Sequence, residues 1–224
     1  IVSHVKPSDA ENSTGVDELV DMDDGDHVVF TDISFTGKQL KEAIIGGSTL
    51  NGGDKDNLMF LNSDGTPVNG LHVANGFGGD DQIFGSTEDD QLNGGDGDDL
   101  LLPGLGDDEA NGGAGSDTFQ VLAGANREMV VSLLAGTAFG QGRDTLTSIE
   151  NVIVTAGQNH EVEGNDDANA IYTGDGIDVI SGRGGDDMID AGGEDDYIVG
   201  GVGSDVIMAG GGNIDVMISG SAAK

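Results

Sequence analysis

The sequence contains no cysteine and no tryptophan, and aromatic residues make up only 4% of its 224 positions. Without cysteine the chain has neither disulfides nor thiolate metal ligands. Basic residues are scarce as well, because 8 lysines and arginines stand against 42 acidic residues and leave a net charge of −34. A charge of this sign repels nucleic acid and favours cations as partners.

Long apolar runs are also missing, and no stretch approaches the roughly 18 residues that a membrane span requires. The chain has no HExxH, GxSxG or complete GxGxxG motif, and no cysteine nucleophile. Its four histidines, His4, His27, His72 and His160, are scattered along the sequence. We therefore predict that this chain is not an enzyme.

What the chain does contain is glycine, 41 residues in all, and much of it recurs with a period of nine. Residues 76–120 read GFGGDDQIF, GSTEDDQLN, GGDGDDLLL, PGLGDDEAN and GGAGSDTFQ. The sixth place of each nonapeptide is aspartate: Asp81, Asp90, Asp99, Asp108 and Asp117. The eighth place is apolar: Ile83, Leu92, Leu101, Ala110 and Phe119. A fixed period of this kind indicates one structural unit, repeated.

A second array runs in phase from residue 155 to residue 208. Its sixth places are His160, Asn169, Asp178, Asp187, Asp196 and Asp205. Ala209 breaks the phase, and residues 210–218 complete one further repeat with Asp215. His160 and Asn169 depart from the aspartate rule, so the first two loops of this array are the weakest metal sites that the pattern predicts.

The composition of the repeat suits a hard cation. Glycine lets the backbone turn tightly and expose its carbonyl oxygens, and Ca²⁺ takes six to eight oxygen ligands from carboxylates and carbonyls. A loop of about six residues and a strand of about three fill each nonapeptide, so that two nonapeptides close one coil. Loops 18 residues apart then lie over one another, and each pair is expected to hold an ion between them.

We expect the calcium ligands to lie in these loops and in the isolated repeat around Asp144. The predicted metal-binding residues are Gly76, Gly78, Asp80, Asp81, Asp90, Gly94, Asp96, Asp98, Asp99, Asp108, Gly112, Asp117, Asp144, Asp178, Asp187, Asp196, Asp205 and Asp215. Several Ca²⁺ ions are the only cofactor predicted.

The pattern GGxGxDxUx, where U is apolar, resembles the RTX (haemolysin-type) calcium-binding repeats. The resemblance is strong over 76–120 and good over 155–218. It implies an all-β fold, a parallel β-roll (a two-sheet β-helix or solenoid), here with an irregular N-terminal region. It also implies a secreted bacterial protein, extracellular or on the cell surface, often exported by type I secretion and folded outside the cell by calcium.

We divide the chain into four parts. Residues 1–51 form an irregular N-terminal segment, with β structure or a short helix at 38–45. Residues 52–120 form the first block, which is regular from 76. Residues 121–147 hold a connector strand and the isolated repeat. Residues 148–224 form the second block, in which 148–154 are expected to continue the stack without a loop site.

The seventh and ninth places should face outward, and several of them are apolar. The first block presents polar residues on one face and Phe84, Leu100 and Leu102 on the other. The second block is apolar on both faces. Patches of this size need a cover. Either the N-terminal segment or a neighbouring block packs on them, or the rolls self-associate side by side or end to end.

The leading interpretation is a calcium-folded structural module in an extracellular assembly such as a surface layer, filament, matrix or adhesin. The alternative is the non-catalytic RTX region of a type I-secreted enzyme or toxin, whose catalytic domain lies outside this chain. A carbohydrate-binding module is a third interpretation, with only Tyr172, Tyr197 and seven phenylalanines to stack on sugars. Flanking sequence distinguishes the first two.

Overall fold

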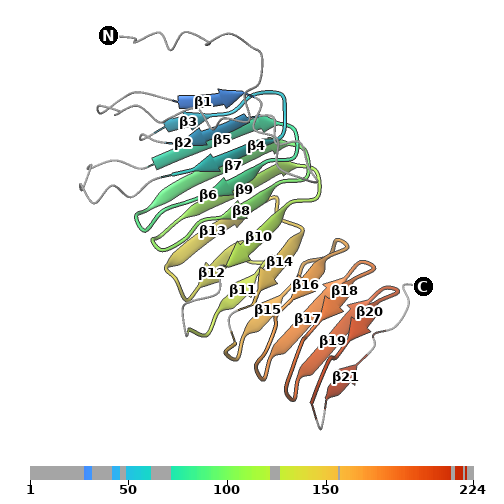
Figure 1. Ribbon diagram of the computed structural model, residues 1–224. Helices are drawn as coiled ribbons and strands as arrows, with labels where there is room; N and C mark the ends of the chain where they lie inside the picture. Colours follow the sequence, from blue (N-terminus) through green and yellow to red (C-terminus); the bar gives the residue numbers. More distant parts are fainter. Residues whose placement is uncertain are drawn as a thin grey trace, which may run out of the picture.

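The computed structural model describes residues 28–31, 42–45, 49–61, 72–121, 127–155, 157–212, 215–218 and 220. Every regular element in these ranges is a strand, which confirms the all-β class. The strands form two long sheets, and the chain winds between them as a parallel β-roll (Figure 1). Among these residues no helix is long and apolar enough to cross a membrane.

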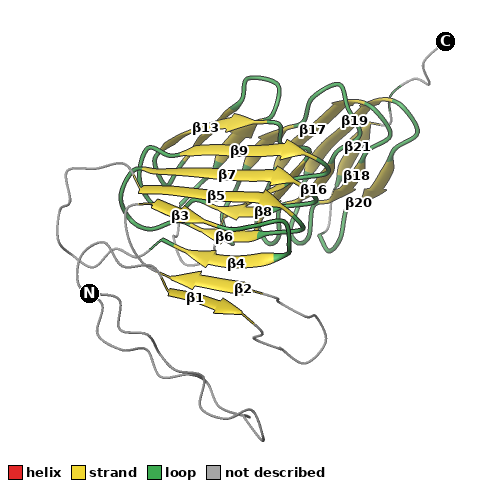
Figure 2. Cartoon of the chain, turned by 90° about the horizontal axis from the view of Figure 1, so that it is seen from above, coloured by secondary structure: helices red, strands yellow, loops and turns green. Residues whose placement is uncertain are grey.

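The ten-stranded sheet contains, in spatial order, β1 (Val28–Thr31), β2 (Glu42–Ile45), β4 (Asn57–Phe60), β6 (Gln82–Phe84), β8 (Leu100–Leu102), β10 (Thr118–Val121), β14 (Asn151–Val154), β16 (Ala170–Tyr172), β18 (Met188–Asp190) and β20 (Val206–Met208). The eleven-stranded sheet contains β21 (Val216–Ile218), β19 (Tyr197–Val202), β17 (Val179–Gly184), β15 (Glu161–Glu163), β11 (Val130–Ser132), β12 (Thr137–Phe139), β13 (Arg143–Thr147), β9 (Glu109–Ala114), β7 (Asp90–Asp96), β5 (His72–Gly78) and β3 (Thr49–Asn51). Figure 2 shows the two layers, with β5, β7 and β9 in one and β4, β6 and β8 in the other.

From β5 to β10 and from β15 to β20, neighbouring strands of the same sheet within a block pair in parallel with an offset of 18 residues. Leu92 of β7 is opposite Ala110 of β9, and Ile83 of β6 is opposite Leu101 of β8. The eighth-place side chains from both sheets therefore meet in one column. Ten of them are at most 1% exposed: Ile83, Leu92, Leu101, Ala110, Phe119, Val162, Ile171, Ile180, Ile189 and Ile198. This confirms the predicted coil and its narrow core.

The N-terminal end corrects one expectation. Residues 42–45, where a short helix was expected to end, form strand β2, which pairs in parallel with β4. Strand β1 then pairs antiparallel with β2 and closes this edge of the ten-stranded sheet. From β2 onward the chain alternates between the two sheets, because β3 belongs to the eleven-stranded sheet and β4 to the ten-stranded sheet. Leu50 of β3 is already fully buried. The remaining N-terminal residues of the predicted segment, 1–27, 32–41 and 46–48, lie outside the described residues.

The connector between the two blocks adds more strands to one sheet than to the other. Three strands, β13, β12 and β11, separate β9 from β15 in one sheet, whereas β14 alone separates β10 from β16 in the other. Strand β12 is antiparallel to both of its neighbours. Two extra strands lengthen one sheet by about 10 Å at about 4.8 Å per strand. The roll therefore bends at the connector, and the second block is tilted against the first (Figure 1).

The outer faces follow the predicted division in part, but Leu102, which was expected on an exposed apolar face, is only 4% exposed. On the eleven-stranded sheet the first block carries an asparagine ladder, in which Asn75 Nδ2 donates to Asn51 Oδ1 at 2.9 Å and Asn93 Nδ2 donates to Asn75 Oδ1 at 3.0 Å. On the other sheet Phe60 and Phe84 stack at 4.7 Å between ring centroids. Amide and aromatic side chains thus align along the stack, where cross-strand pairs stabilise a sheet.

Candidate metal centre

The loops at the two sides of the roll stack as the period predicts. Phe77 is in register with Gly95, and Gly95 with Gly113, so the loops 76–81, 94–99 and 112–117 lie directly over one another. Each loop begins after an outward-facing ninth place and ends on the sixth-place residue. The stacking therefore brings the carboxylates of successive coils into one row.

Ten sixth-place aspartates form a hydrogen bond to the coil before them. One oxygen, Oδ1, accepts a hydrogen bond from the backbone N–H of the residue in the equivalent place of the preceding coil. These donor–acceptor pairs, at 2.6 to 3.2 Å, are Asn57–Asp81, Asp81–Asp99, Asp99–Asp117, Asp90–Asp108, Asp108–Asp144, His160–Asp178, Asp178–Asp196, Asn169–Asp187, Asp187–Asp205 and Asp196–Asp215.

The second carboxylate oxygen of most of these residues is buried without a donor. The oxygens concerned are Oδ2 of Asp81, Asp99, Asp108, Asp117, Asp178, Asp187 and Asp196. An unpaired buried polar atom costs free energy, and an unpaired buried charge costs far more. Seven such atoms at one phase of a repeat indicate a missing positive partner, and a hard cation supplies it.

Where glycine stands at the first place, it leaves room for that partner; Pro103, Thr173 and Ala191 stand at this place in three of the loops. A Cβ atom on Gly94 would lie 2.1 Å from Asp99 Oδ2 and 2.6 Å from the carbonyl oxygen of Gly112, one coil further on. At Gly182 the corresponding distances are 2.2 Å to Asp187 Oδ2 and 2.5 Å to the Gly200 carbonyl oxygen. Each of these first-place glycines thus borders a space on which a carboxylate and a carbonyl of adjacent coils converge.

Backbone conformation divides the loops into two kinds. In the open loops, 76–81, 94–99, 103–108, 112–117, 173–178, 182–187, 191–196 and 200–205, the second and fourth residues both have positive φ. The residues concerned are Phe77, Gly79, Gly95, Gly97, Gly104, Gly106, Gly113, Gly115, Gly174, Gly176, Arg183, Gly185, Gly192, Glu194, Gly201 and Gly203. All seven unpaired carboxylate oxygens belong to open loops.

The closed loops, 52–57, 85–90 and 164–169, lack these positive φ values, and in each of them a sixth-place oxygen accepts a hydrogen bond from within the loop. The second-place N–H donates to the sixth-place oxygen: Gly53 to Asn57 at 2.9 Å, Ser86 to Asp90 at 2.5 Å and Asn165 to Asn169 at 2.8 Å. Asp90 Oδ1 also lies within hydrogen-bond distance of His72 Nδ1, at 3.1 Å. Both Asp90 oxygens therefore have partners, in contrast to the seven unpaired carboxylate oxygens of the open loops.

One residue in the row of stacked carboxylates was not predicted from the sequence. Glu150 Oε2 accepts the N–H of Asp117 at 2.8 Å and so takes the sixth-place role in a coil where no loop site was expected. The Asp117 carbonyl accepts from both Glu150 N and Asn151 N, which marks a bulge with one extra residue. The available signal was an acidic residue directly before the alternating run 151–154.

The other predicted ligands lie around this row. Asp80 and Asp98 are exposed on the rim, where each Oδ1 accepts the N–H of the equivalent residue in the next coil, at 3.0 and 2.8 Å. Asp96 is exposed as well, and a Cβ on Gly78 would meet nothing closer than 3.8 Å. Among the described residues no three acidic or histidine side chains form a group that could hold a metal. A site built here therefore depends on carbonyl oxygens beside the sixth-place carboxylates.

Burial disfavours the ionised form of these carboxylates when no cation is bound to them. Desolvation raises the pKa of Asp81 and Asp108 from 3.8 to about 7 and that of Asp99, Asp117, Asp144, Asp187 and Asp196 to about 6. Neighbouring carboxylates raise most of these pKa values further, Asp117 acting on Asp99 for example. Ionisation at neutral pH therefore opposes the metal-free fold.

Without calcium, the chain is expected to gain β structure as the pH falls. Folded-state pKa values above the unfolded value of 3.8 add stability that is complete below about pH 4 and lost as the pH rises through about 6 to 7. Circular dichroism in EGTA should show little sheet at about pH 8 and more at about pH 5. A signal independent of pH over this window would contradict the burial of ionisable carboxylates.

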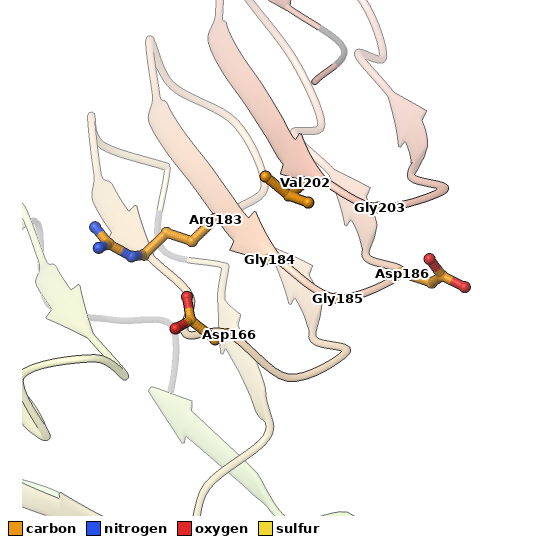
Figure 3. A pocket seen from close by; sticks show the side chains of 7 residues that line it. All are labelled: Asp166, Arg183, Gly184, Gly185, Asp186, Val202 and Gly203. Atoms are coloured by element: carbon orange, nitrogen blue, oxygen red, sulfur yellow. The ribbon is translucent and has the colours of Figure 1, made fainter. Parts of the chain in front are cut away.

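One surface hollow lies on the turns of the second block, beside the loop row. It has a volume of about 440 Å³ and is lined by Asp166, Arg183, Gly184, Gly185, Asp186, Val202 and Gly203 (Figure 3). Arg183 forms an ion pair with Glu163 at 2.5 Å, and Asp186 accepts the N–H of Ser204 at 2.7 Å. Arg183 and Asp186 at this hollow therefore both contact residues of a neighbouring coil.

Comparison with known families agrees with this geometry. The family described as RTX calcium-binding nonapeptide repeat (4 copies) matches residues 75–110, 163–198 and 188–213. No curated protein matches the chain. Repeats of this family bind several Ca²⁺ ions, form β-rolls and are typically a non-catalytic region. Both repeat blocks of the chain therefore contain RTX calcium-binding nonapeptide repeats.

Proposed function

We propose that this chain is a calcium-folded structural module of a secreted bacterial protein, and that it acts in an extracellular assembly such as a surface layer, filament, matrix or adhesin. The observation that carries the proposal is the row of seven buried carboxylate oxygens without a donor. A rod that is complete only with cations bound is suited to an environment where calcium is abundant.

The open loops are the proposed binding sites. Their sixth-place carboxylates and the first-place carbonyls of the next coil would hold the ions, as at Asp99 with Gly112 or Asp187 with Gly200. When bound, Ca²⁺ supplies positive charge and accepts oxygen ligands in a flexible geometry. Asp144, Asp205 and Asp215 continue the row, and each accepts a backbone N–H from the preceding coil.

Two properties of the chain make its folding depend on that charge. The core is a single column of side chains, which is a small apolar gain for so many ordered residues. The net charge of −34 adds repulsion that grows as the coils approach one another. Binding free energy then contributes directly to folding, as in other metal-dependent domains.

The outer faces support a role in an assembly. Apolar side chains on both faces of the second block are exposed, among them Val179, Tyr197, Met188 and Val206. Exposed apolar patches mark surfaces that meet another surface. We propose that the module self-associates through these faces once calcium has folded it, whereas the unfolded, strongly acidic chain stays apart.

The calcium concentration needed for folding tests the extracellular role. We expect the midpoint of a calcium titration, followed by circular dichroism at neutral pH, to lie at about 10⁻⁴ to 10⁻³ M, the range of extracellular calcium modules. At submicromolar calcium the chain would then remain unfolded inside the cell. A midpoint below about 10⁻⁶ M would contradict the proposal, because the module would fold before export.

A further inference from the structure

The loops on one side of the first block follow a common dipeptide, asparagine at the ninth place and glycine at the first. The pairs are Asn51 with Gly52, Asn75 with Gly76, Asn93 with Gly94, and Asn111 with Gly112. In the second block the residues before Gly164, Gly182 and Gly200 are Glu163, Ser181 and Val199. The repeat therefore does not require asparagine before its first glycine, and these pairs are a property of the first block. One further pair, Asn69 with Gly70, lies outside the described residues.

The glycine of these pairs is fixed by the space around it. A Cβ atom on Gly76 would meet Asp81 Oδ2 and the carbonyl oxygen of Gly94, and one on Gly112 would meet the carbonyl oxygen of Ser148. Each asparagine is thus followed by a residue that has no side chain to shield its backbone nitrogen and whose backbone turns freely in an unfolded chain.

An asparagine in this setting is open to attack by its own backbone. The glycine nitrogen gives up its proton to hydroxide and attacks the asparagine Cγ, and the side-chain nitrogen leaves as ammonia with a proton from water. Water then adds to either carbonyl carbon of the resulting succinimide ring and opens it to aspartate or isoaspartate. In sum, asparagine and water yield the acid and ammonia, and no oxidant or reductant takes part.

The folded roll withholds the reacting groups. The Gly52 N–H donates to the carbonyl oxygen of Asn75 at 2.7 Å, so this nitrogen is already engaged. The asparagine ladder on the layer of β5 and β7 holds the amides, because Asn75 Nδ2 donates to Asn51 Oδ1 at 2.9 Å and Asn93 Nδ2 donates to Asn75 Oδ1 at 3.0 Å (Figure 2). In a parallel strand ψ is about +115°, which also turns the following nitrogen away from the side chain.

The ladder stops before Asn111. This residue is in register with Asn93, yet among the described residues no hydrogen bond holds its side chain. Asn111 is exposed, whereas Asn75 and Asn93 are half-buried. Its amide is therefore held less firmly in the folded roll than the amides of the other two.

We propose that these Asn–Gly pairs are sites of spontaneous deamidation in the calcium-free chain, and that the asparagine ladder of the calcium-bound roll protects Asn51, Asn75 and Asn93. The protection rests on the proposed function, because the ladder forms only when calcium has folded the roll. Each reaction replaces an amide by a carboxylate, and like charges opposite each other destabilise a sheet. The first block thus registers irreversibly how long a chain has remained without calcium.

The test is to incubate the whole chain at neutral pH in EGTA and in millimolar calcium, and to follow deamidation of each peptide by mass spectrometry after digestion. In EGTA we expect the four pairs to react at similar rates. In calcium the rates at Asn75 and Asn93 should fall by about tenfold or more, because reaction there requires local opening of the roll, and the rate at Asn111 should fall least. Asn151 is the internal control, since the β-branched Val152 follows it, and it should stay unmodified in both conditions.

Circular dichroism of the calcium sample separates two failures. Absence of sheet signal in calcium would overturn the proposed function and, with it, the protection. A full sheet signal with equal deamidation rates in calcium and in EGTA would overturn the protection alone, as would equal slowing at Asn93 and Asn111. Pairs that stay intact in EGTA while a synthetic peptide LNGGDG, the sequence of residues 92–97, reacts would show that they are not deamidation sites.

Two variants test the ladder without the reaction. Asn93→Asp and Asn111→Asp each add one charge to the same face of the same sheet, but only the first removes a ladder donor. We expect Asn93→Asp to lower the urea midpoint of the calcium-bound chain by more than Asn111→Asp does. Equal midpoints for the two variants would contradict a ladder that holds Asn93 in place.

Discussion

Chelation of calcium with EGTA at neutral pH is expected to abolish the β-sheet circular dichroism of this chain, and millimolar calcium is expected to restore it. The reason is electrostatic. Burial has already raised the pKa values of the sixth-place carboxylates, to about 7 for Asp81 and Asp108, so their ionisation at neutral pH opposes folding. Removing the cations leaves seven buried oxygens without any partner.

The core cannot compensate for that loss. Most strands of the repeat blocks contribute a single apolar core side chain, and two of these are alanines, Ala74 and Ala110. The expected change is therefore a loss of the whole fold and not of a few loops, so dichroism at all sheet wavelengths should collapse in one transition. Coils that stack in one dimension depend on their neighbours, and the loss of one interface weakens the next.

Magnesium is the control for this experiment. Mg²⁺ requires near-octahedral geometry at shorter distances and gives up its waters reluctantly, so a cradle of backbone carbonyls suits it poorly. We expect magnesium at the same concentration to restore much less sheet than calcium. Equal recovery with both ions would indicate general screening of the −34 charge and not specific binding.

The second large effect is expected from Gly94→Ala. The new methyl group would lie 2.1 Å from Asp99 Oδ2 and 2.6 Å from the Gly112 carbonyl, which is the space proposed for the cation. Backbone atoms cannot move aside as a flexible side chain can, so overpacking alone should cost about 3 kcal/mol. The lost ion adds to that cost. Gly94 does not have a positive φ, so left-handed strain plays no part.

Gly157→Ala is the matched control, because a Cβ there meets nothing within 4 Å. We expect the calcium midpoint of the control to match that of the unmodified chain and the midpoint of Gly94→Ala to rise about tenfold or more. Calcium titrations of the three proteins, followed by circular dichroism, compare them directly. Similar midpoints for both variants would show that the first-place space is not a binding site.

The periodic part of the fold was accessible from sequence because each place has one dominant physical role. The apolar eighth places predicted the column of core side chains, and the burial of Ile83 confirms it. The 18-residue coil predicted the strand register, and the pairing of Ile83 with Leu101 confirms it. The sixth-place row followed from the same period. These features depend on local chemistry repeated many times, so single departures did not obscure them.

The division into open and closed loops was not accessible in the same way. Ser86 and Asn165 stand at the second place of closed loops, but Phe77 and Arg183 stand at the same place in open loops with φ of 75° and 76°. Residue type therefore does not decide the conformation there. The contact of Asp90 with His72 crosses 18 residues, and it becomes visible only when the coils are stacked.

The connector escaped prediction for a different reason. A strand around Val130 was expected. This strand, β11, pairs with β15, although β12 and β13 follow it directly in the sequence, and nothing local in the sequence specifies that order. The short helix expected at 38–45 followed from apolar spacing over eight residues. Residues 42–45 form a strand instead, because the neighbouring strand β4 offers a parallel partner and a continuous sheet.

The central claim is that cations in the open loops hold the folded roll together. The most direct measurement is the number of calcium ions bound per chain, determined by equilibrium dialysis and elemental analysis alongside circular dichroism of the same samples. The account predicts several ions per folded chain, with binding and sheet formation rising together along one titration curve. A chain that is fully folded at neutral pH while it holds no calcium would contradict it.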